Sequence, residues 1–167
     1  HNRGYFMPQA EQMLAQAEKA NQIVTCIIFD LDKFKEINDS FGHTTGDWAL
    51  ETVASTVKTC IRKQDLFARL GGEEFIILLP NCDIQAASYV ADKCAAQLTD
   101  IDTAATGHKF MISASFGVSN SALSGYEITK LISHTDDAMY QAKDGGRNQV
   151  SFYQHTVDKE QLPLQLN

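Results

Sequence analysis

The sequence has few of the features that mark several large protein classes. Its 167 residues include only 3 prolines and 10 glycines, which excludes collagen-like and low-complexity chains. The longest apolar stretches, at residues 23–29 and 75–80, are far shorter than the roughly 18 residues that a membrane helix needs. We therefore expect one globular domain with an ordinary core and no membrane contact.

Positive charge is also scarce. The chain has 14 lysines and arginines against 21 aspartates and glutamates, for a net charge of -7. A protein that binds nucleic acid non-specifically presents a basic surface to the phosphates, so we expect no nucleic-acid partner. An anionic substrate would have to be captured locally, by a metal ion or by a few lysines and arginines.

The four cysteines form no CxxC pair, which excludes the usual zinc and thioredoxin-type motifs. Each lies in or beside an apolar run and is interpreted as a small buried side chain; they are Cys26, Cys60, Cys82 and Cys94. Free thiols favour a reducing, cytoplasmic location. No signal peptide opens the chain, which we expect to be part of a longer protein that could itself be membrane-anchored.

Hydrophobic periodicity predicts helices alternating with strands. Helices are expected at 9–22, 47–62, 83–98 and 128–143, with Asp83 as an N-cap and Gly145-Gly146 ending the last helix. Strands are expected at 23–29, 65–70, 73–79 and 149–153, and a half-exposed one at 109–119. Gly71-Gly72 between two apolar runs is a strong hairpin signal. This order predicts an α/β (α+β) sandwich in which helices cover one sheet.

Carboxylates gather at two of these elements. Asp30 ends a buried strand, where a carboxylate is costly unless it is paired or binds a cation. Glu73 and Glu74 begin the return strand of the hairpin, and only one of them can share a face with Asp30. Mg²⁺ needs only one or two carboxylates when substrate phosphates and water supply its other ligands. From spacing alone, solvated acids beside a plain turn are an equally good interpretation.

These acids belong to a longer series of motifs. Residues 71–75, Gly-Gly-Glu-Glu-Phe, resemble the signature of the GGDEF family, the bacterial diguanylate cyclases, in its GGEEF form. Further blocks follow in family order: residues 2–6 resemble NRxxF, 30–39 DxDxFKxIND, 42–47 GHxxGD, 113–118 the late strand and 142–148 AKxxGRN. Gly4 stands where the family usually has a second arginine, and the DxLT segment before it is missing. The resemblance implies a single GGDEF domain over residues 1–167, without its DxLT segment or the sensor domain fused to it in the full-length protein.

The resemblance implies a mostly antiparallel, palm-like sheet of the ferredoxin or nucleotidyl-cyclase type, covered by helices, whose hairpin carries GGEEF. It implies that two GTP molecules are condensed into cyclic di-GMP with release of pyrophosphate. The cofactor would be Mg²⁺ or Mn²⁺. Because each domain offers one nucleotide pocket, a transient two-fold homodimer is expected to bring the two substrates together.

Individual roles also follow from the resemblance. Metal would be held by Asp30, the Leu31 carbonyl, Glu73 and Glu74. Glu73 would also deprotonate the ribose 3′-hydroxyl, and Lys35 would stabilise the transition state. Base and phosphates would be bound by Asn38, His43, Asp47, Gly71, Gly72, Lys143 and Arg147. Without the resemblance, Asp47 would be interpreted as a helix N-cap and Asn38-Asp39 as a turn.

An RxxD motif, Arg62 to Asp65, precedes Gly71 by the spacing of the family's inhibitory site for cyclic di-GMP. Lys93 is the nearest match to an additional arginine of that site, and lysine lacks the planar bidentate fork. A simple helix-end ion pair is the alternative for the motif. For the whole domain the alternatives are a catalytically weak receptor that binds cyclic di-GMP through RxxD, and a palm-like enzyme acting on another nucleotide. The complete set of signature acids favours the cyclase.

Overall fold

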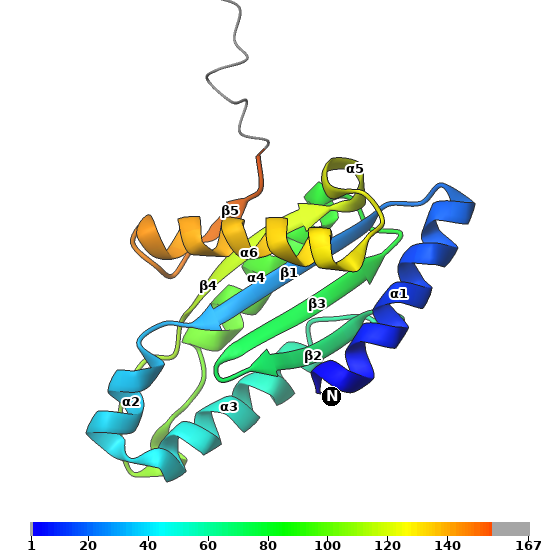
Figure 1. Ribbon diagram of the computed structural model, residues 1–167. Helices are drawn as coiled ribbons and strands as arrows, with labels where there is room; N and C mark the ends of the chain where they lie inside the picture. The colour runs from blue at the N-terminus through cyan, green and yellow to red at the C-terminus, as the bar shows by residue number, and fades with distance from the viewer. Residues whose placement is uncertain (1, 155–167) are drawn as a thin grey trace, which may run out of the picture.

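A five-stranded sheet with helices on both faces organises the chain (Figure 1). The computed structural model describes residues 2–154. Its strands are β1 (Val24–Leu31), β2 (Leu66–Gly71), β3 (Glu74–Pro80), β4 (Ala114–Asn120) and β5 (Val150–Phe152). Its helices are α1 (Arg3–Ala20), α2 (Phe34–Phe41), α3 (His43–Lys58), α4 (Ile84–Thr99), α5 (Ser121–Ser124) and α6 (Ile128–Asp144), with a 3-10 turn at Ala104–Thr106.

The strand order is β2-β3-β1-β4-β5, and every pairing except the parallel β4–β5 pair is antiparallel. The central strand β1 is buried along its whole length, as its continuous apolar run predicts. The expected mostly antiparallel sheet covered by helices is thus confirmed.

The two faces of the sheet carry separate cores. Cys26 and Ile28 of β1 point to the core made with α1 and α6, whereas Ile27 and Phe29 point to the core made with α3 and α4. Figure 1 shows α1 and α6 crossing the near face of the sheet and α4 behind it. The ring of Phe29 stacks on that of Phe75 at 5.1 Å between centroids and extends a ladder across three strands to Phe116.

Helix α6 lies unusually close to the sheet over Gly117 of β4. A Cβ atom on Gly117 would meet the Met139 backbone nitrogen and the Thr135 carbonyl oxygen, both at 2.3 Å. Only a residue without a side chain allows this approach. The close contact sets the height of α6 above the strand ends.

The hairpin, the Asp83 N-cap and the end of α6 at Gly145 match the sequence-based expectation. Two expectations about 109–119 were wrong: the strand begins at Ala114, and it is buried along its length rather than half-exposed. Its alternating polar residues are serines that bond internally, such as Ser119 Oγ, 2.7 Å from Ser124 Oγ. The alternation therefore does not mark a solvent face.

The sequence pattern also missed helix α2 and placed the start of α3 too late. Phe34, Ile37 and Phe41 do form an apolar stripe at i, i+3 and i+7, but α2 is only eight residues long and buries only Ile37, so its stripe is too short to stand out. Asn38 consequently lies in a helix, not a turn, and Asp47 lies inside α3, which begins at His43, so neither alternative interpretation holds. Within residues 2–154, no helix combines the length and the apolar character needed to cross a membrane.

Candidate active site

The register of the sheet decides which hairpin acid faces Asp30. In the β1–β3 ladder the Cα of Asp30 pairs with that of Glu74, so these two side chains share the face covered by α6. Glu73 precedes β3, and its carbonyl oxygen accepts a hydrogen bond of 3.2 Å from the Leu31 amide. The turn before it requires glycine, because Gly72 has a φ of +52°.

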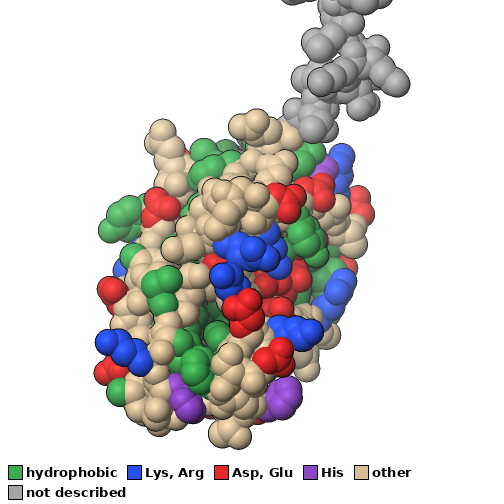
Figure 2. Space-filling view, turned by 90° about the vertical axis from the view of Figure 1, so that its left-hand side faces the viewer, with side chains coloured by type: hydrophobic (Ala, Val, Ile, Leu, Met, Phe, Trp, Pro, Cys, Tyr) green, Lys and Arg blue, Asp and Glu red, His purple; other side chains and the backbone are tan. Residues whose placement is uncertain are grey.

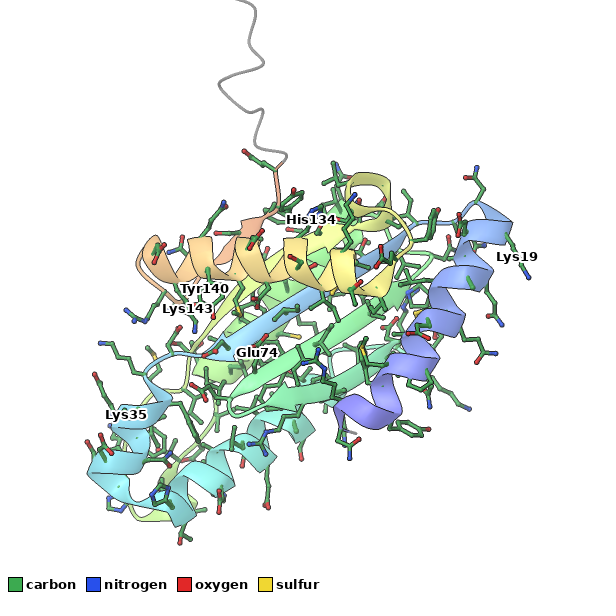
Figure 3. All side chains as sticks on the ribbon, viewed as in Figure 1. Lys19, Lys35, Glu74, His134, Tyr140 and Lys143 are labelled. Atoms are coloured by element: carbon green, nitrogen blue, oxygen red, sulfur yellow. The ribbon has the colours of Figure 1, made fainter. Side chains whose placement is uncertain are left out.

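Lys143, in the last turn of α6, supplies the positive charge at this point. Its Nζ lies 3.0 Å from Asp30 Oδ2 and 5.5 Å from the centre of the Tyr140 ring. Figure 3 shows Lys143 and Tyr140 on the end of α6 above the strand ends, with Glu74 below them. The space-filling view from this side shows lysine or arginine side chains directly beside a group of acids (Figure 2).

Burial dominates the electrostatics of these carboxylates. Desolvation raises the pKa of Asp30, and the nearby Glu73 adds to this, while Lys143 opposes it. Burial, the Asp136 carboxylate of α6 and Asp30 together raise the pKa of Glu74 to about 7. Several acids therefore compete for one ammonium group, an arrangement that an additional cation would stabilise.

The donor set fits a hard divalent cation such as Mg²⁺. The carboxylates of Asp30 and Glu73 are close enough to raise the pKa of Asp30, and the Leu31 and Glu73 carbonyls lie on the adjoining backbone. Among residues 2–154, no cluster of three or more histidines, cysteines or acids could enclose a metal alone. An all-oxygen site of this kind leaves positions for phosphate oxygens and water.

Asp32 has a different environment, although it lies only two residues beyond Asp30. Its carboxylate accepts hydrogen bonds from Ser113 Oγ at 2.7 Å, Ser115 Oγ at 2.6 Å and the Asn148 amide at 3.0 Å. These bonds join the end of β1 to the start of β4 and to the turn after α6. Asp32 thus fixes the frame around the site.

Helices α2 and α3 form a second part of the site. A Cβ atom on Gly46 would lie 1.8 Å from Asn38 Oδ1, so the GHxxGD glycine allows these helices to pack. Asn38 Oδ1 is buried and has no hydrogen-bond partner within the described part of the chain. His43 and Asp47 are exposed one turn apart on α3. A ligand's N–H group could reach this acceptor only after the Asn38 side chain turns away from Gly46.

Two predicted phosphate or transition-state contacts lie apart from the Asp30–Lys143 pair. Lys35 is exposed on α2, at the left-hand side of Figure 3. Arg147 lines a cavity of about 550 Å³ beside α2, together with Asp32 and Lys33. The structure therefore brings Lys143 to the carboxylates and leaves Lys35 and Arg147 at the edge of the site.

The RxxD motif forms a closed turn after α3. Arg62 Nη2 lies 2.8 Å from Asp65 Oδ1 and donates to the Pro80 carbonyl at 2.8 Å, while Asp65 Oδ2 accepts from the Arg62 amide at 2.7 Å. This pairing raises the pKa of Arg62. Lys93 is exposed on α4. The helix-end ion pair is thus present, and the Arg62 side chain remains substantially exposed, at 44%.

Comparison with known proteins agrees with this geometry. Residues 1–149 match the family described as "Diguanylate cyclase, GGDEF domain". The chain belongs to the GGDEF family. The enzyme class that this family defines is diguanylate cyclase.

Individual relatives extend over most of this GGDEF domain. Diguanylate cyclase A of Treponema denticola is 36% identical over 142 residues, which are 85% of the chain and 37% of that protein. The active GGEEF domain of a Vibrio cholerae diguanylate cyclase superposes with a TM-score of 0.84 at 31% identity, covering 93% of this chain and 98% of that one. The GGDEF domain of DgcB from Caulobacter crescentus, in complex with c-di-GMP, gives a TM-score of 0.84 at 27% identity, covering 90% and 87%. The first curated relatives are much longer proteins, of which the chain spans 14 to 37%.

Sequence reasoning missed three positions of this GGDEF domain that shape the site. Asp136 and Tyr140 approach Glu74 and Lys143 from α6, and Gly46 accommodates Asn38. A usable signal existed for α6, because residues 136, 140 and 143 follow the i, i+4, i+7 spacing of one helix stripe. The GHxxGD motif includes Gly46 but does not show its role, because that role depends on the contact between two helices.

Proposed function

We propose that this GGDEF domain condenses two GTP molecules into cyclic di-GMP. The observation that carries the proposal is the pairing of the buried Asp30 with the half-buried Glu74 at the hairpin, with Glu73 beside them and Lys143 Nζ 3.0 Å from Asp30. Carboxylates facing a single ammonium at the edge of a sheet suit a triphosphate that arrives with Mg²⁺ or Mn²⁺.

The chemistry is two equivalent phosphoryl transfers. Each ribose 3′-oxygen attacks the α-phosphorus of the other GTP. Two P–O bonds form, the two phosphoanhydride bonds between α- and β-phosphates break, and two pyrophosphates leave. Bound metal would neutralise the charge that develops on the phosphate oxygens. Asp30, Glu73 and the Leu31 carbonyl would hold it, with Glu74 beside them.

The protein's own residues would supply the rest of the catalysis. Glu73 accepts the proton of the 3′-hydroxyl, since its carboxylate is adjacent to the site without being sequestered by the Lys143 pair. When a metal ion binds Asp30, Lys143 would be released from its ion pair and could bind the terminal phosphates. Lys35 and Arg147 reach the nucleotide from the edge of the site, and Gly71 and Gly72 leave room for it.

Selection of guanine is proposed for the pocket between α2 and α3. Guanine presents two N–H donors on one edge, which suit the exposed Asp47 carboxylate, and the Asn38 side chain would join them after turning away from Gly46. His43, one turn from Asp47, would line the same pocket. An adenine edge offers no equivalent pair of donors, so the arrangement favours GTP.

A two-fold homodimer is required because one domain holds one GTP. Two copies facing each other would bring each 3′-oxygen to the partner's α-phosphorus. The activity per molecule should therefore fall on dilution below the dimer constant. Constant activity at every dilution would argue against the dimer.

Feedback inhibition is proposed at the RxxD turn, where the Arg62 guanidinium is exposed beside Asp65 and Lys93 is the additional cation. A catalytically weak domain that only binds cyclic di-GMP there is the second candidate. Two observations support this candidate: Arg62 is held by Asp65 and the Pro80 carbonyl in an ordered RxxD turn, and the related DgcB domain has been solved in complex with c-di-GMP.

One experiment separates the two. The protein is incubated with GTP and Mg²⁺ and the product identified, with Glu73→Gln as the inactive control. We expect cyclic di-GMP from the wild type only, and Arg62→Ala should relieve its inhibition by the product. Tight binding of added cyclic di-GMP without synthesis would favour the receptor.

A further inference from the structure

Two of the buried cysteines lie against each other at the junction of α3 and α4. The Cys60 thiol, just after α3, donates to Gln97 Oε1 at 3.2 Å. Gln97 lies one turn beyond Cys94 on α4, so that both present their side chains to the same place. Cys60 and Cys94 belong to the same core between α3 and α4, and the Cys60 thiol is close enough to Cys94 to help raise its pKa.

We propose that Cys60 and Cys94 form a redox-modification site that closes to a disulfide when the protein meets a peroxide. Peroxide first oxidises the Cys60 thiol to a sulfenic acid and leaves as water. The Cys94 sulfur then attacks the sulfenic sulfur, the S–S bond forms and a second water leaves. Overall, two thiols give up two hydrogens and two electrons, and one peroxide becomes two waters.

The environments of the four cysteines assign the order of these steps. Cys60 is 9% exposed at the rim of the core, whereas Cys94 is fully buried behind it. Burial raises the pKa of Cys94, so this thiol reacts with peroxide more slowly than Cys60 and has to lose its proton when it attacks the sulfenic sulfur. Cys26 is buried on the other face of the sheet, and Cys82 directs its thiol to the Asp83 carbonyl, 3.6 Å away.

The position of the pair links this chemistry to the proposed inhibitory site. Cys60 precedes Arg62 by two residues, and Cys94 directly follows Lys93. A bond between the two sulfurs would fix the RxxD turn against α4, and so hold Arg62 and Lys93 at one spacing. This consequence rests on the proposed function. Pre-ordering one long side chain should tighten cyclic di-GMP binding by about threefold.

The test uses the full chain treated with hydrogen peroxide and then digested without reductant. We expect a Cys60–Cys94 linked peptide and a melting temperature raised by about 5 °C, both reversed by dithiothreitol. Cys60→Ser should abolish both effects while keeping a donor to Gln97, and Cys82→Ser should leave both intact. Persistent thiols, or a link from Cys60 to Cys82, would overturn the proposal.

A second measurement separates this proposal from the cyclase proposal. The affinity for cyclic di-GMP is measured before and after peroxide treatment. The Cys60→Ser protein, which cannot form the disulfide, is treated in the same way and serves as the reference. Equal affinities would overturn the regulatory consequence. A protein that forms the disulfide but makes no cyclic di-GMP from GTP would refute the cyclase proposal alone.

Discussion

Asp30 and Asp32 both lie at the end of β1, but their carboxylates have different partners. Asp32 accepts three hydrogen bonds, from Ser113, Ser115 and the Asn148 amide. Asp30 has a single ion pair, to Lys143, and a pKa raised by burial. Both residues are almost equally hidden, at 8% and 9% exposed, so burial alone does not distinguish them.

The difference lies in how well each carboxylate is satisfied. A buried charge with a full set of donors stabilises the fold, whereas one left short of partners is held at a cost and is available for a ligand. The comparison therefore separates a residue that holds the fold together, Asp32, from one that is proposed to bind the metal, Asp30. Substitutions at these positions can break or sharpen this distinction.

The largest effect is expected from Asp30→Asn. Losing the carboxylate that would hold the metal should lower the rate of cyclic di-GMP formation by roughly 10³-fold or more. The unfolding free energy should change by less than about 1 kcal/mol, because the variant no longer buries a charge. Product formation and urea unfolding measure the two quantities. Asp92→Asn, on an exposed position of α4, is the matched control, and full activity in Asp30→Asn would refute the assignment.

Asp32→Asn should have the reverse profile. Replacing the carboxylate weakens charge-assisted hydrogen bonds from two serines and a backbone amide, so we expect a loss of about 2 to 3 kcal/mol in unfolding free energy. Activity should persist wherever the variant is folded. Urea unfolding measures the loss of stability, and the rate of cyclic di-GMP formation at low temperature, where the variant stays folded, measures its activity. A stable but inactive Asp32→Asn would move this residue into the active site.

Glu74→Gln tests the electrostatics through pH. The folded protein raises the pKa of Glu74 to about 7, so the stability contributed by the protonated form is complete below the ordinary glutamate pKa and is lost as the pH rises through about 7. Between about pH 5 and pH 8 the unfolding free energy of the wild type should fall by about 1 to 2 kcal/mol more than that of the variant. This figure allows for the screening by solvent of a half-buried charge. Thermal unfolding across this range measures the difference. Glu73→Gln serves as control, and parallel pH curves for wild type and Glu74→Gln would contradict the prediction.

A smaller effect, on ligand binding, is expected from Lys143→Gln. Affinity for a non-hydrolysable GTP analogue should fall by about tenfold, the worth of one charged contact. The variant leaves the buried Asp30 carboxylate without this counter-ion, so the unfolding free energy should also fall by roughly 1 to 3 kcal/mol. Calorimetric titration provides the measurement, with Lys130→Gln near the start of the same helix as control. Unchanged affinity would remove Lys143 from the phosphate site.

The sequence predicted the regular part of this architecture well. Continuous apolar runs revealed β1 and β3, and Gly71-Gly72 revealed the hairpin between β2 and β3. It failed at α2, where the apolar stripe of Phe34, Ile37 and Phe41 is confined to eight residues. It also failed at β4, whose internally bonded serines imitate a solvent-facing strand, because those bonds are tertiary and no local pattern reports them.

For the site, the motifs located the acids but not their pairing. The sequence could say that only one hairpin glutamate shares a face with Asp30, and the β1–β3 register assigns that position to Glu74. The contrast between Asp30 and Asp32 was likewise hidden, because it depends on hydrogen bonds from residues more than 80 positions away along the chain.

The contact at Gly117 fixes the distance between helix α6 and the sheet. Because α6 rests directly on the strand there, with no room for even a methyl group beneath Met139 and Thr135, the height of that helix is set by one missing side chain. Lys143 is carried at the far end of the same helix. Anything that lifted α6 would withdraw the ammonium from Asp30 without altering either residue. The position of Lys143 above Asp30 thus depends on a glycine in the middle of β4, a strand that supplies none of the proposed metal or phosphate ligands.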